Sequence, residues 1–166
     1  MTNHPATHDA VVATRTFDAP ITLVWQMWTD AEHFRSWNGP TGFSVPVAEM
    51  DLRVGGKRLV CMQSPDGSRT MWTTGEFTEI VPNTRLVYTE SPCDENGDAV
   101  SPAAMGMPEG TPQTTVVTVA LQDLGGRTAM VMTHAGVPAS SGAGAGWEQA
   151  FDKLAGYMET ALKQDS

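Results

Sequence analysis

The stretch that decides the fold is WEQAFDKLAGYMETALK, which occupies residues 147–163. Its bulky apolar residues recur every three or four positions, with acidic and basic residues between them, and this pattern predicts an amphipathic helix. The apolar positions are Trp147, Phe151, Leu154, Met158 and Leu162. A helix face this apolar must be buried, and its natural partner is the concave side of a sheet. The Gly- and Ala-rich residues 139–146 before it predict a flexible joint.

A strand and two short helices are predicted near the start of the chain. Residues Ala10–Phe17 alternate in polarity and are rich in β-branched side chains, which favours a strand. Pro20 suits a helix start, and the apolar residues that follow define one helical face up to about Asp30. Asp30 can cap a second helix, Ala31–Trp37, because its carboxylate can accept from the free amides of the first turn.

Further segments between residues 43 and 134 have the composition of strands, separated by turn signals such as Gly55-Gly56 and Pro65-Asp66-Gly67. They span residues 43–52, 57–63, 70–81, 84–91, 114–122 and 127–134. Gly75 interrupts one of them, which indicates a bulge or a close backbone approach. The sequence therefore predicts an α+β fold: a curved antiparallel sheet of about seven strands wrapped around a long C-terminal helix, with two short helices after the first strand.

Two segments lie outside these elements. Residues 1–9 lack periodicity and are expected to form a disordered tail, which leaves residues 10–166 as a single domain. The connection over residues 92–113 is much longer than a hairpin requires. Its Met105 and Met107 could cover the mouth of a pocket, so the segment is a candidate lid, although disorder explains it equally well.

Composition narrows the classes of function. Among 166 residues, 10 Lys plus Arg against 19 Asp plus Glu give a net charge of −9. The basic residues form no cluster, and both observations argue against a nucleic-acid partner.

No apolar run approaches the roughly 18 residues of a membrane span. The first residues have neither the basic start nor the apolar stretch of a secretory signal. We therefore expect a cytoplasmic protein that does not interact with membranes.

The sequence contains none of the familiar motifs for metal, cofactor or nucleophilic chemistry. No paired-cysteine or His-x-x-x-His spacing appears, so we predict no metal and no cofactor. Cys61 and Cys93 lack basic neighbours and are expected to be free thiols. His134, near a strand end, could carry a proton in a cavity or be solvated. Glu76 and Glu79 could enter the cavity or lie at sheet edges, and a regular strand would put them on opposite faces.

A series of short motifs follows in order along the chain. It consists of Phe17-Asp-Ala-Pro20, Val24-Trp-Gln-Met-Trp-Thr-Asp30, Trp37-Asn-Gly-Pro40, Asp51-Leu-Arg-Val-Gly-Gly56, Pro65-Asp-Gly67, Gly75-Glu-Phe-Thr-Glu-Ile-Val-Pro82, Arg85-Leu-Val-Tyr88, Asp94-Glu-Asn-Gly97 and Gly146-Trp147. With these motifs, the chain resembles the activator-of-heat-shock-protein-90-ATPase-homologue-like family over about residues 11–163. This family belongs to the START-like, birch-pollen-allergen-like helix-grip superfamily (SRPBCC). The chain departs from many members at Asn38, where a second Trp is common, and in residues 104–108.

The resemblance implies a helix-grip fold with a hydrophobic cavity, but the family shares no single reaction and no universal catalytic motif. We therefore expect the protein to bind a small hydrophobic or amphipathic molecule between the curved sheet and the last helix. The candidate ligand-binding residues are Trp37, Trp72, Phe77, Tyr88, Met132, His134, Trp147, Phe151, Leu154 and Met158. Tyr88 and His134 are the candidate polar contacts, and ordinary core packing remains the alternative for the tryptophans.

Two other functions stay open. A cofactor-free enzyme acting on a small molecule in the same cavity would use His134 or a strand glutamate. A co-chaperone-like regulator of a heat-shock chaperone ATPase, which the family name suggests, would instead expose an apolar or charged patch. The sequence does not identify the ligand, and a homodimer formed through a sheet edge or the first helices is compatible with it.

Overall fold

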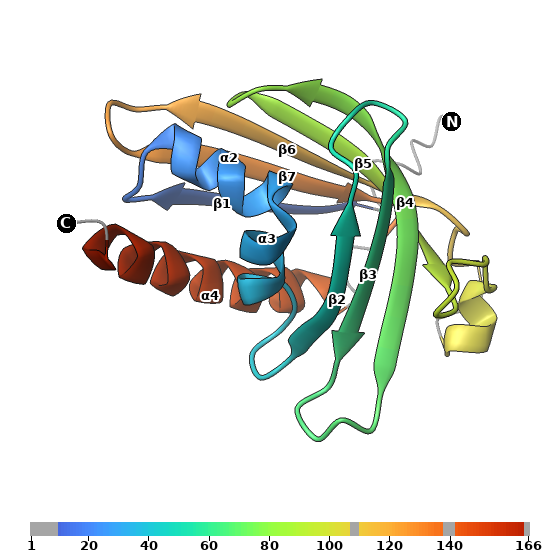
Figure 1. Cartoon of the computed structure of the whole chain (residues 1–166). Helices are drawn as coiled ribbons and strands as arrows, with labels where there is room; N and C mark the ends of the chain where they lie inside the picture. Colours follow the sequence, from blue (N-terminus) through green and yellow to red (C-terminus); the bar gives the residue numbers. More distant parts are fainter. Residues whose placement is uncertain (1–9, 107–109, 138–141, 165–166) are drawn as a thin grey trace, which may run out of the picture.

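An antiparallel sheet grips one long helix (Figure 1). The computed structural model describes residues 10–106, 110–137 and 142–164, and within them the sheet has seven strands. The strands are β1 (Ala10–Phe17), β2 (Ser44–Met50), β3 (Lys57–Gln63), β4 (Thr70–Val81), β5 (Arg85–Cys93), β6 (Thr115–Asp123) and β7 (Thr128–Ala135). The helices are α2 (Ile21–Thr29), α3 (Ala31–Trp37), the 3₁₀ helix η1 (Pro102–Met105) and α4 (Ala143–Gln164). The predicted α+β helix-grip fold is confirmed.

The strands follow the order β1-β7-β6-β5-β4-β3-β2, and every neighbouring pair is antiparallel. Strands β2 to β7 are neighbours in both sequence and space, as in a series of hairpins. Strand β1 instead lies beside β7, with Ala10 opposite Ala135 and Phe17 opposite Thr128. The helices α2 and α3 therefore carry the chain from one edge strand, β1, to the other, β2.

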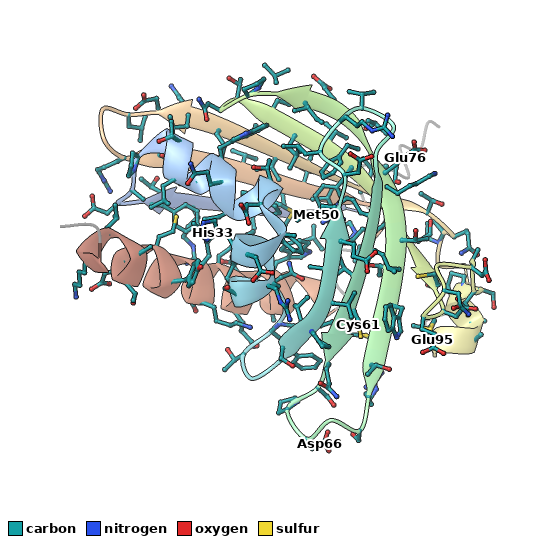
Figure 2. All side chains as sticks on the ribbon, in the orientation of Figure 1. His33, Met50, Cys61, Asp66, Glu76 and Glu95 are labelled. Atoms are coloured by element: carbon teal, nitrogen blue, oxygen red, sulfur yellow. The ribbon has the colours of Figure 1, made fainter. Side chains whose placement is uncertain are left out.

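Asp30 separates the two short helices. Its Oδ1 accepts hydrogen bonds from the amides of Glu32 (2.9 Å) and His33 (3.3 Å), which satisfies donors that the first turn of α3 leaves free. The predicted cap is confirmed. His33, labelled in Figure 2, also places its Nδ1 2.9 Å from the Tyr157 hydroxyl, so a polar contact joins α3 to α4.

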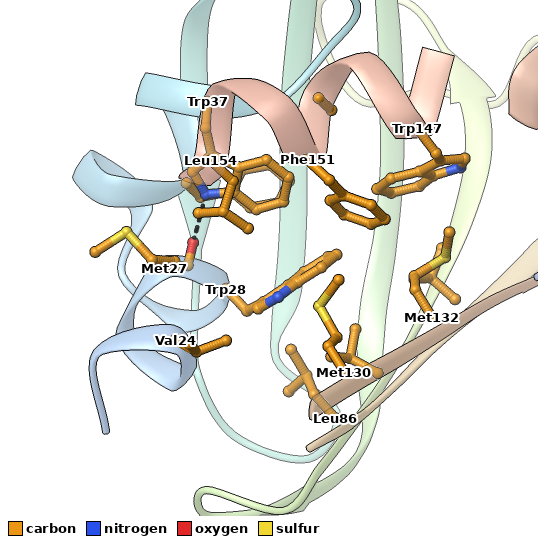
Figure 3. Close-up of a cluster of buried hydrophobic side chains, with 14 of the residues drawn as sticks. Val24, Met27, Trp28, Trp37, Leu86, Met130, Met132, Trp147, Phe151 and Leu154 are labelled. Carbon is orange, nitrogen blue, oxygen red and sulfur yellow. Dashed lines mark hydrogen bonds between the residues drawn. The ribbon is translucent and has the colours of Figure 1, made fainter. Parts of the chain in front are cut away.

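Aromatic side chains from α2, α3 and α4 fill much of the concave face of the sheet (Figure 3). The fully buried Trp28 ring lies 4.9 Å from Trp37, 6.1 Å from Trp147 and 6.1 Å from Phe151, measured between ring centroids. The Trp37 indole N–H donates to the Met27 carbonyl at 3.0 Å. The amphipathic face of α4 is therefore buried against the sheet through ring-to-ring contacts.

The helix α4 begins earlier than the sequence pattern predicts. Residues from Ala143 onward are helical, so the expectation of a flexible joint is wrong for residues 143–146. Residues 139–141 of that segment and the predicted tail, residues 1–9, lie outside the described residues. Within the described part of the chain, no helix combines the length and the hydropathy that crossing a membrane requires.

The first part of the long connection after β5 has regular structure. Strand β5 continues to Cys93, and a turn over residues 94–97 brings Ala99 back to bridge with Cys93. Ser101 then caps η1. Met107, one of the two methionines of the candidate lid, lies outside the described residues.

Gly75 allows two strands to approach closely. A side-chain carbon at this position would collide with the backbone carbonyl oxygen of Thr89 on β5. The predicted close approach is therefore confirmed, whereas the bulge lies farther along β4, between Phe77 and Glu79. Beyond the bulge, Glu79 forms an ion pair with Arg85 at 3.0 Å.

Two alanine substitutions should change stability in opposite directions. Gly75→Ala should lower the free energy of unfolding by about 2 kcal/mol or more, because the strands must separate to admit the methyl group. Gly156→Ala adds a carbon with nothing within 4 Å on the exposed side of α4, and should raise this free energy by about 0.5–1 kcal/mol. Urea unfolding followed by circular dichroism measures both changes. Equal small effects would contradict the close approach at Gly75.

Candidate ligand-binding site

A cavity of about 450 Å³ lies between the first turns of α4 and one end of the sheet. In Figure 1, these turns of α4 point toward β2 and β3. The wall consists of Asn38, Gly39, Pro40, Met62, Met71, Thr73, Glu90, Ser91, Pro92, Thr111, Pro112, Thr115, His134, Gly136, Val137, Gly142, Ala143, Gly146, Trp147 and Ala150. Most of these residues are small or apolar, so the wall offers few polar groups.

Small residues at the start of α4 leave this space open. Ala143, Gly146 and Ala150 present at most a methyl group to the cavity, and Trp147 adds a large ring beside them. A Cβ at Gly146 would lie 3.4 Å from Pro40 Cγ, so the same small residue lets the helix pack closely on the loop after α3. The cavity therefore lies beside the part of α4 that carries several small residues.

A row of hydrogen bonds crosses the cavity wall. The Trp147 indole N–H donates to His134 Nδ1 at 3.1 Å, and His134 Nε2 lies 2.8 Å from Thr115 Oγ1. Because an indole nitrogen can only donate, Nδ1 must carry the lone pair and Nε2 the proton. Nε2 then donates to Thr115, whose hydroxyl donates to the Glu90 carbonyl at 3.4 Å. The four residues thus form one chain of donors and acceptors with a single consistent direction.

Glu90 gives the wall a carboxylate. Its Oε1 lies 3.6 Å from His134 Nε2, beyond hydrogen-bond distance, and its side chain is 22% exposed. Among the described wall residues, Glu90 is the one with a formal charge at neutral pH. The cavity wall is therefore weakly polar and negatively charged.

Burial lowers the pKa of His134, and the Glu90 carboxylate opposes this shift. The hydrogen bond from Trp147 acts in the same direction as burial, because a proton on Nδ1 would remove its acceptor. The neutral imidazole is the form that completes the row of hydrogen bonds. Protonation of His134 would break the contact between β7 and the first turns of α4.

Glu90, rather than the predicted Glu76 or Glu79, is the strand glutamate on the cavity wall, and the sequence contains a signal for it. Leu86 and Tyr88 are buried, and Glu90 follows them at the same two-residue spacing, so strand alternation puts all three on one face. By contrast, neither Glu76 nor Glu79 belongs to the described cavity wall. Figure 2 shows Glu76 on the part of the sheet away from α4.

Lys153 fixes the rim of the cavity to α4. Its ammonium group contacts the carbonyl oxygens of Asn38 (3.3 Å), Gly39 (3.1 Å), Pro40 (3.2 Å) and Phe43 (3.2 Å). Burial lowers the pKa of this ammonium group. Since the loop between α3 and β2 supplies all of these acceptors, one cation holds the loop in place.

The predicted ligand-binding residues separate into a wall group and a core group. His134 and Trp147 lie on the cavity wall. The core group packs under α4 and against the sheet, and consists of Trp37, Phe77, Tyr88, Met132, Phe151, Leu154 and Met158. Trp72 is half-buried on β4 between the wall residues Met71 and Thr73, and strand alternation turns it to the opposite face. All seven belong to the hydrophobic core, and Figure 3 shows four of them, Trp37, Met132, Phe151 and Leu154, in the cluster between α4 and the sheet.

Tyr88 contacts a buried cation in the core. The Arg58 guanidinium lies 3.6 Å from the Tyr88 ring centroid, 5.2 Å from that of Phe34 and 5.6 Å from that of Phe77. Arg58 is 2% exposed, and its Nε and Nη2 have no hydrogen-bond partner among the described residues. Burial raises the pKa of Tyr88. The sequence gives no signal for this contact, because an arginine beside Lys57 is typical of a solvated strand end.

The described residues contain no group of three or more His, Cys, Asp or Glu side chains placed to hold a metal ion. Cys61 and Cys93 are free and buried. Burial raises the pKa of both thiols, so neither has the thiolate character of a nucleophile.

A curved sheet that grips a C-terminal helix, with a mostly apolar cavity between the two, defines the class of helix-grip proteins. Within this class, residues 18–159 match the sequence profile of the family described as Activator of Hsp90 ATPase homolog 1-like protein. The chain belongs to this family, as its sequence motifs predict. A search of curated proteins gives no match.

Solved structures from several bacteria share the fold. A protein of Chromobacterium violaceum is 24% identical with a TM-score of 0.75, and the match covers 90% of this chain and 96% of that one. A protein of Nitrosomonas europaea is 21% identical with a TM-score of 0.75, over 94% and 97% of the two chains. A family member from Silicibacter pomeroyi is 19% identical with a TM-score of 0.68, over 93% and 99%. At these identities, the likeness supports the fold alone.

The state of His134 should make stability depend on pH. The unfolded chain protonates this residue near the ordinary pKa of 6.5, whereas burial lowers the pKa in the folded chain. The unfolded state therefore binds more protons below pH 6.5, and the free energy of unfolding should fall as the pH drops toward the folded-state pKa. Urea unfolding at several values between about pH 8 and 5 measures this decline. His134→Asn should flatten it, and an unchanged decline in that variant would assign it to other groups.

Lys153→Met should loosen the loop over residues 38–43. Four carbonyl oxygens lose a partly buried donor, so the free energy of unfolding should fall by about 1–3 kcal/mol. Lys163→Met is the matched control, because that ammonium pairs with Glu159 in an exposed position, and its effect should stay below about 0.5 kcal/mol. Urea unfolding compares the two variants. Equal losses in both would show that the Lys153 contacts do not hold the loop.

Proposed function

We propose that the protein binds a small apolar or amphipathic molecule in the cavity between α4 and the sheet. The observation that carries this proposal is a cavity of about 450 Å³ with a mostly apolar wall and its polar groups gathered in one row. Ligand sites in proteins are typically concave, roughly 300–1,000 Å³ in volume, and lined by apolar side chains with a few placed polar groups. The cavity fits this description in volume and in composition.

Parts of the wall can adapt to a ligand, whereas the rim is fixed. Met62 on β3 and Met71 on β4 are unbranched, polarizable side chains that can adopt several rotamers around a ligand. The loop after α3 is tied to Lys153, so this side of the entrance keeps its position. Such a combination supports binding of several related molecules.

The geometry of His134 favours binding over proton transfer. Its Nδ1 accepts from Trp147 and its Nε2 lies 2.8 Å from Thr115 Oγ1, so both nitrogens are engaged before any ligand enters. A general base needs a free lone pair within reach of the proton that it removes. A cofactor-free reaction at this histidine is therefore the weaker candidate.

A neutral fluorescent probe tests the proposal directly. N-phenyl-1-naphthylamine fluoresces more strongly in apolar surroundings and should bind the protein saturably at one site. Thr73→Phe places a ring in the cavity and should weaken probe binding by about tenfold or more. Thr74→Phe is the matched control, since strand alternation puts that ring on the other face of β4, and it should leave binding within about twofold.

Two results would contradict the proposal. One is the absence of saturable probe binding to the native protein. The other is equal weakening by the two phenylalanine variants, because the cavity would then not be the binding site. Native mass spectrometry of the purified protein adds an independent readout, since a reproducible extra mass that is lost on denaturation would reveal the class of a bound molecule.

A further inference from the structure

We propose that the ligand carries a protonated amine, which lies beside the Glu90 carboxylate while its apolar body occupies the rest of the cavity. This inference rests on the proposed binding function and specifies the chemistry of the ligand. The charge of the wall is the first reason. Among the described wall residues, Glu90 has a formal charge at neutral pH and the others have none, because burial and the contact with Trp147 keep His134 neutral.

The Glu90 carboxylate has no hydrogen-bonded partner in the part of the chain that the structure describes. No described residue donates a hydrogen bond to it, and the nearest cationic candidate, His134 Nε2, is 3.6 Å away and directs its proton to Thr115 at 2.8 Å. A carboxylate that faces an apolar wall loses hydration when a ligand displaces water, and this loss is costly unless the ligand supplies a donor. An ammonium group supplies up to three donors and the opposite charge.

Two cations that lie close to the core, Lys153 and Arg58, cannot take this role. The Lys153 ammonium is occupied by the carbonyl oxygens of the loop after α3, and the Arg58 guanidinium lies over the Tyr88 ring in the core. Neither residue belongs to the cavity wall. A carboxylate ligand would therefore meet Glu90 with no cation among the described wall residues to offset the repulsion, which disfavours fatty acids.

Two further features favour a cation. The Trp147 ring lies on the same wall, and the face of an indole attracts an ammonium group. The net charge of −9 also raises the local concentration of cations around the protein. The second effect acts everywhere on the surface, so a test must separate it from binding at Glu90.

Three unbranched probes of ten carbon atoms each isolate the effect of the head group. Decylamine, decanol and decanoate compete with N-phenyl-1-naphthylamine at neutral pH, where the amine and the acid are charged. We expect decylamine to bind about tenfold or more tightly than decanol, and decanoate to bind most weakly. The preference should persist at physiological salt, because the carboxylate is partly shielded from the solvent.

Glu90→Gln should remove the preference by reducing amine binding to within about threefold of decanol, with decanol binding unchanged. Glu76→Gln is the matched control, because it removes the same charge from the same sheet outside the described cavity wall and should keep the preference. If Glu90→Gln does not fold, as judged by circular dichroism, the ranking of the three probes on the native protein still decides.

The outcomes separate the two proposals. Equal binding of the three probes, tightest binding of decanoate, or equal loss of the preference in both glutamine variants would overturn the amine proposal and leave the apolar cavity as a binding site. A native protein that binds neither the fluorescent probe nor any alkyl probe would overturn the proposed function itself.

Discussion

Trp28 projects from α2 into the concave face of the sheet and meets rings from α3 and α4 at the same time. Because Trp37 and Phe151 also pack against each other, the middle of the concave face is filled by protein. The cavity of about 450 Å³ lies beyond this cluster, where α4 carries the small residues Gly146 and Ala150. The position of the cavity, the closeness of α4 to the sheet and the exposure of Trp147 to the cavity all depend on this packing.

The sequence predicts the elements and their order well, because periodicity is a local property. The two-residue alternation of β1 and the amphipathic face from Trp147 to Met158 are visible without any tertiary contact. The site is harder to predict. Phe151 and Trp147 belong to the same helical face, yet the first lies in the core and the second lines the cavity, since only the fold determines which end of the helix is filled. The inward position of Glu90, by contrast, can be predicted from the alternation of buried residues along its own strand.

The buried Arg58 and the partly buried Lys153 have no carboxylate partner among the described residues, although acidic residues outnumber basic ones. Lys153 uses backbone carbonyl oxygens and Arg58 uses aromatic faces. This arrangement has an effect on the cavity, because neither of these two cations is drawn to Glu90 and its carboxylate stays available. Charge in the interior is thus distributed so that the cations stabilise the fold while the wall keeps a negative group.

The strand order also determines when the fold can form during synthesis. Strand β1 emerges early, but its partner is β7, with Phe17 opposite Thr128, and α4 follows later still. At about 5–20 residues per second, the ribosome needs roughly 5–20 s to make the residues between these partners. During this time the inward side of β1 and the Trp28 ring have no native surface to cover them, and such non-local pairing is slow to form. The nascent chain therefore passes through a prolonged interval in which protection from aggregation must come from outside the fold.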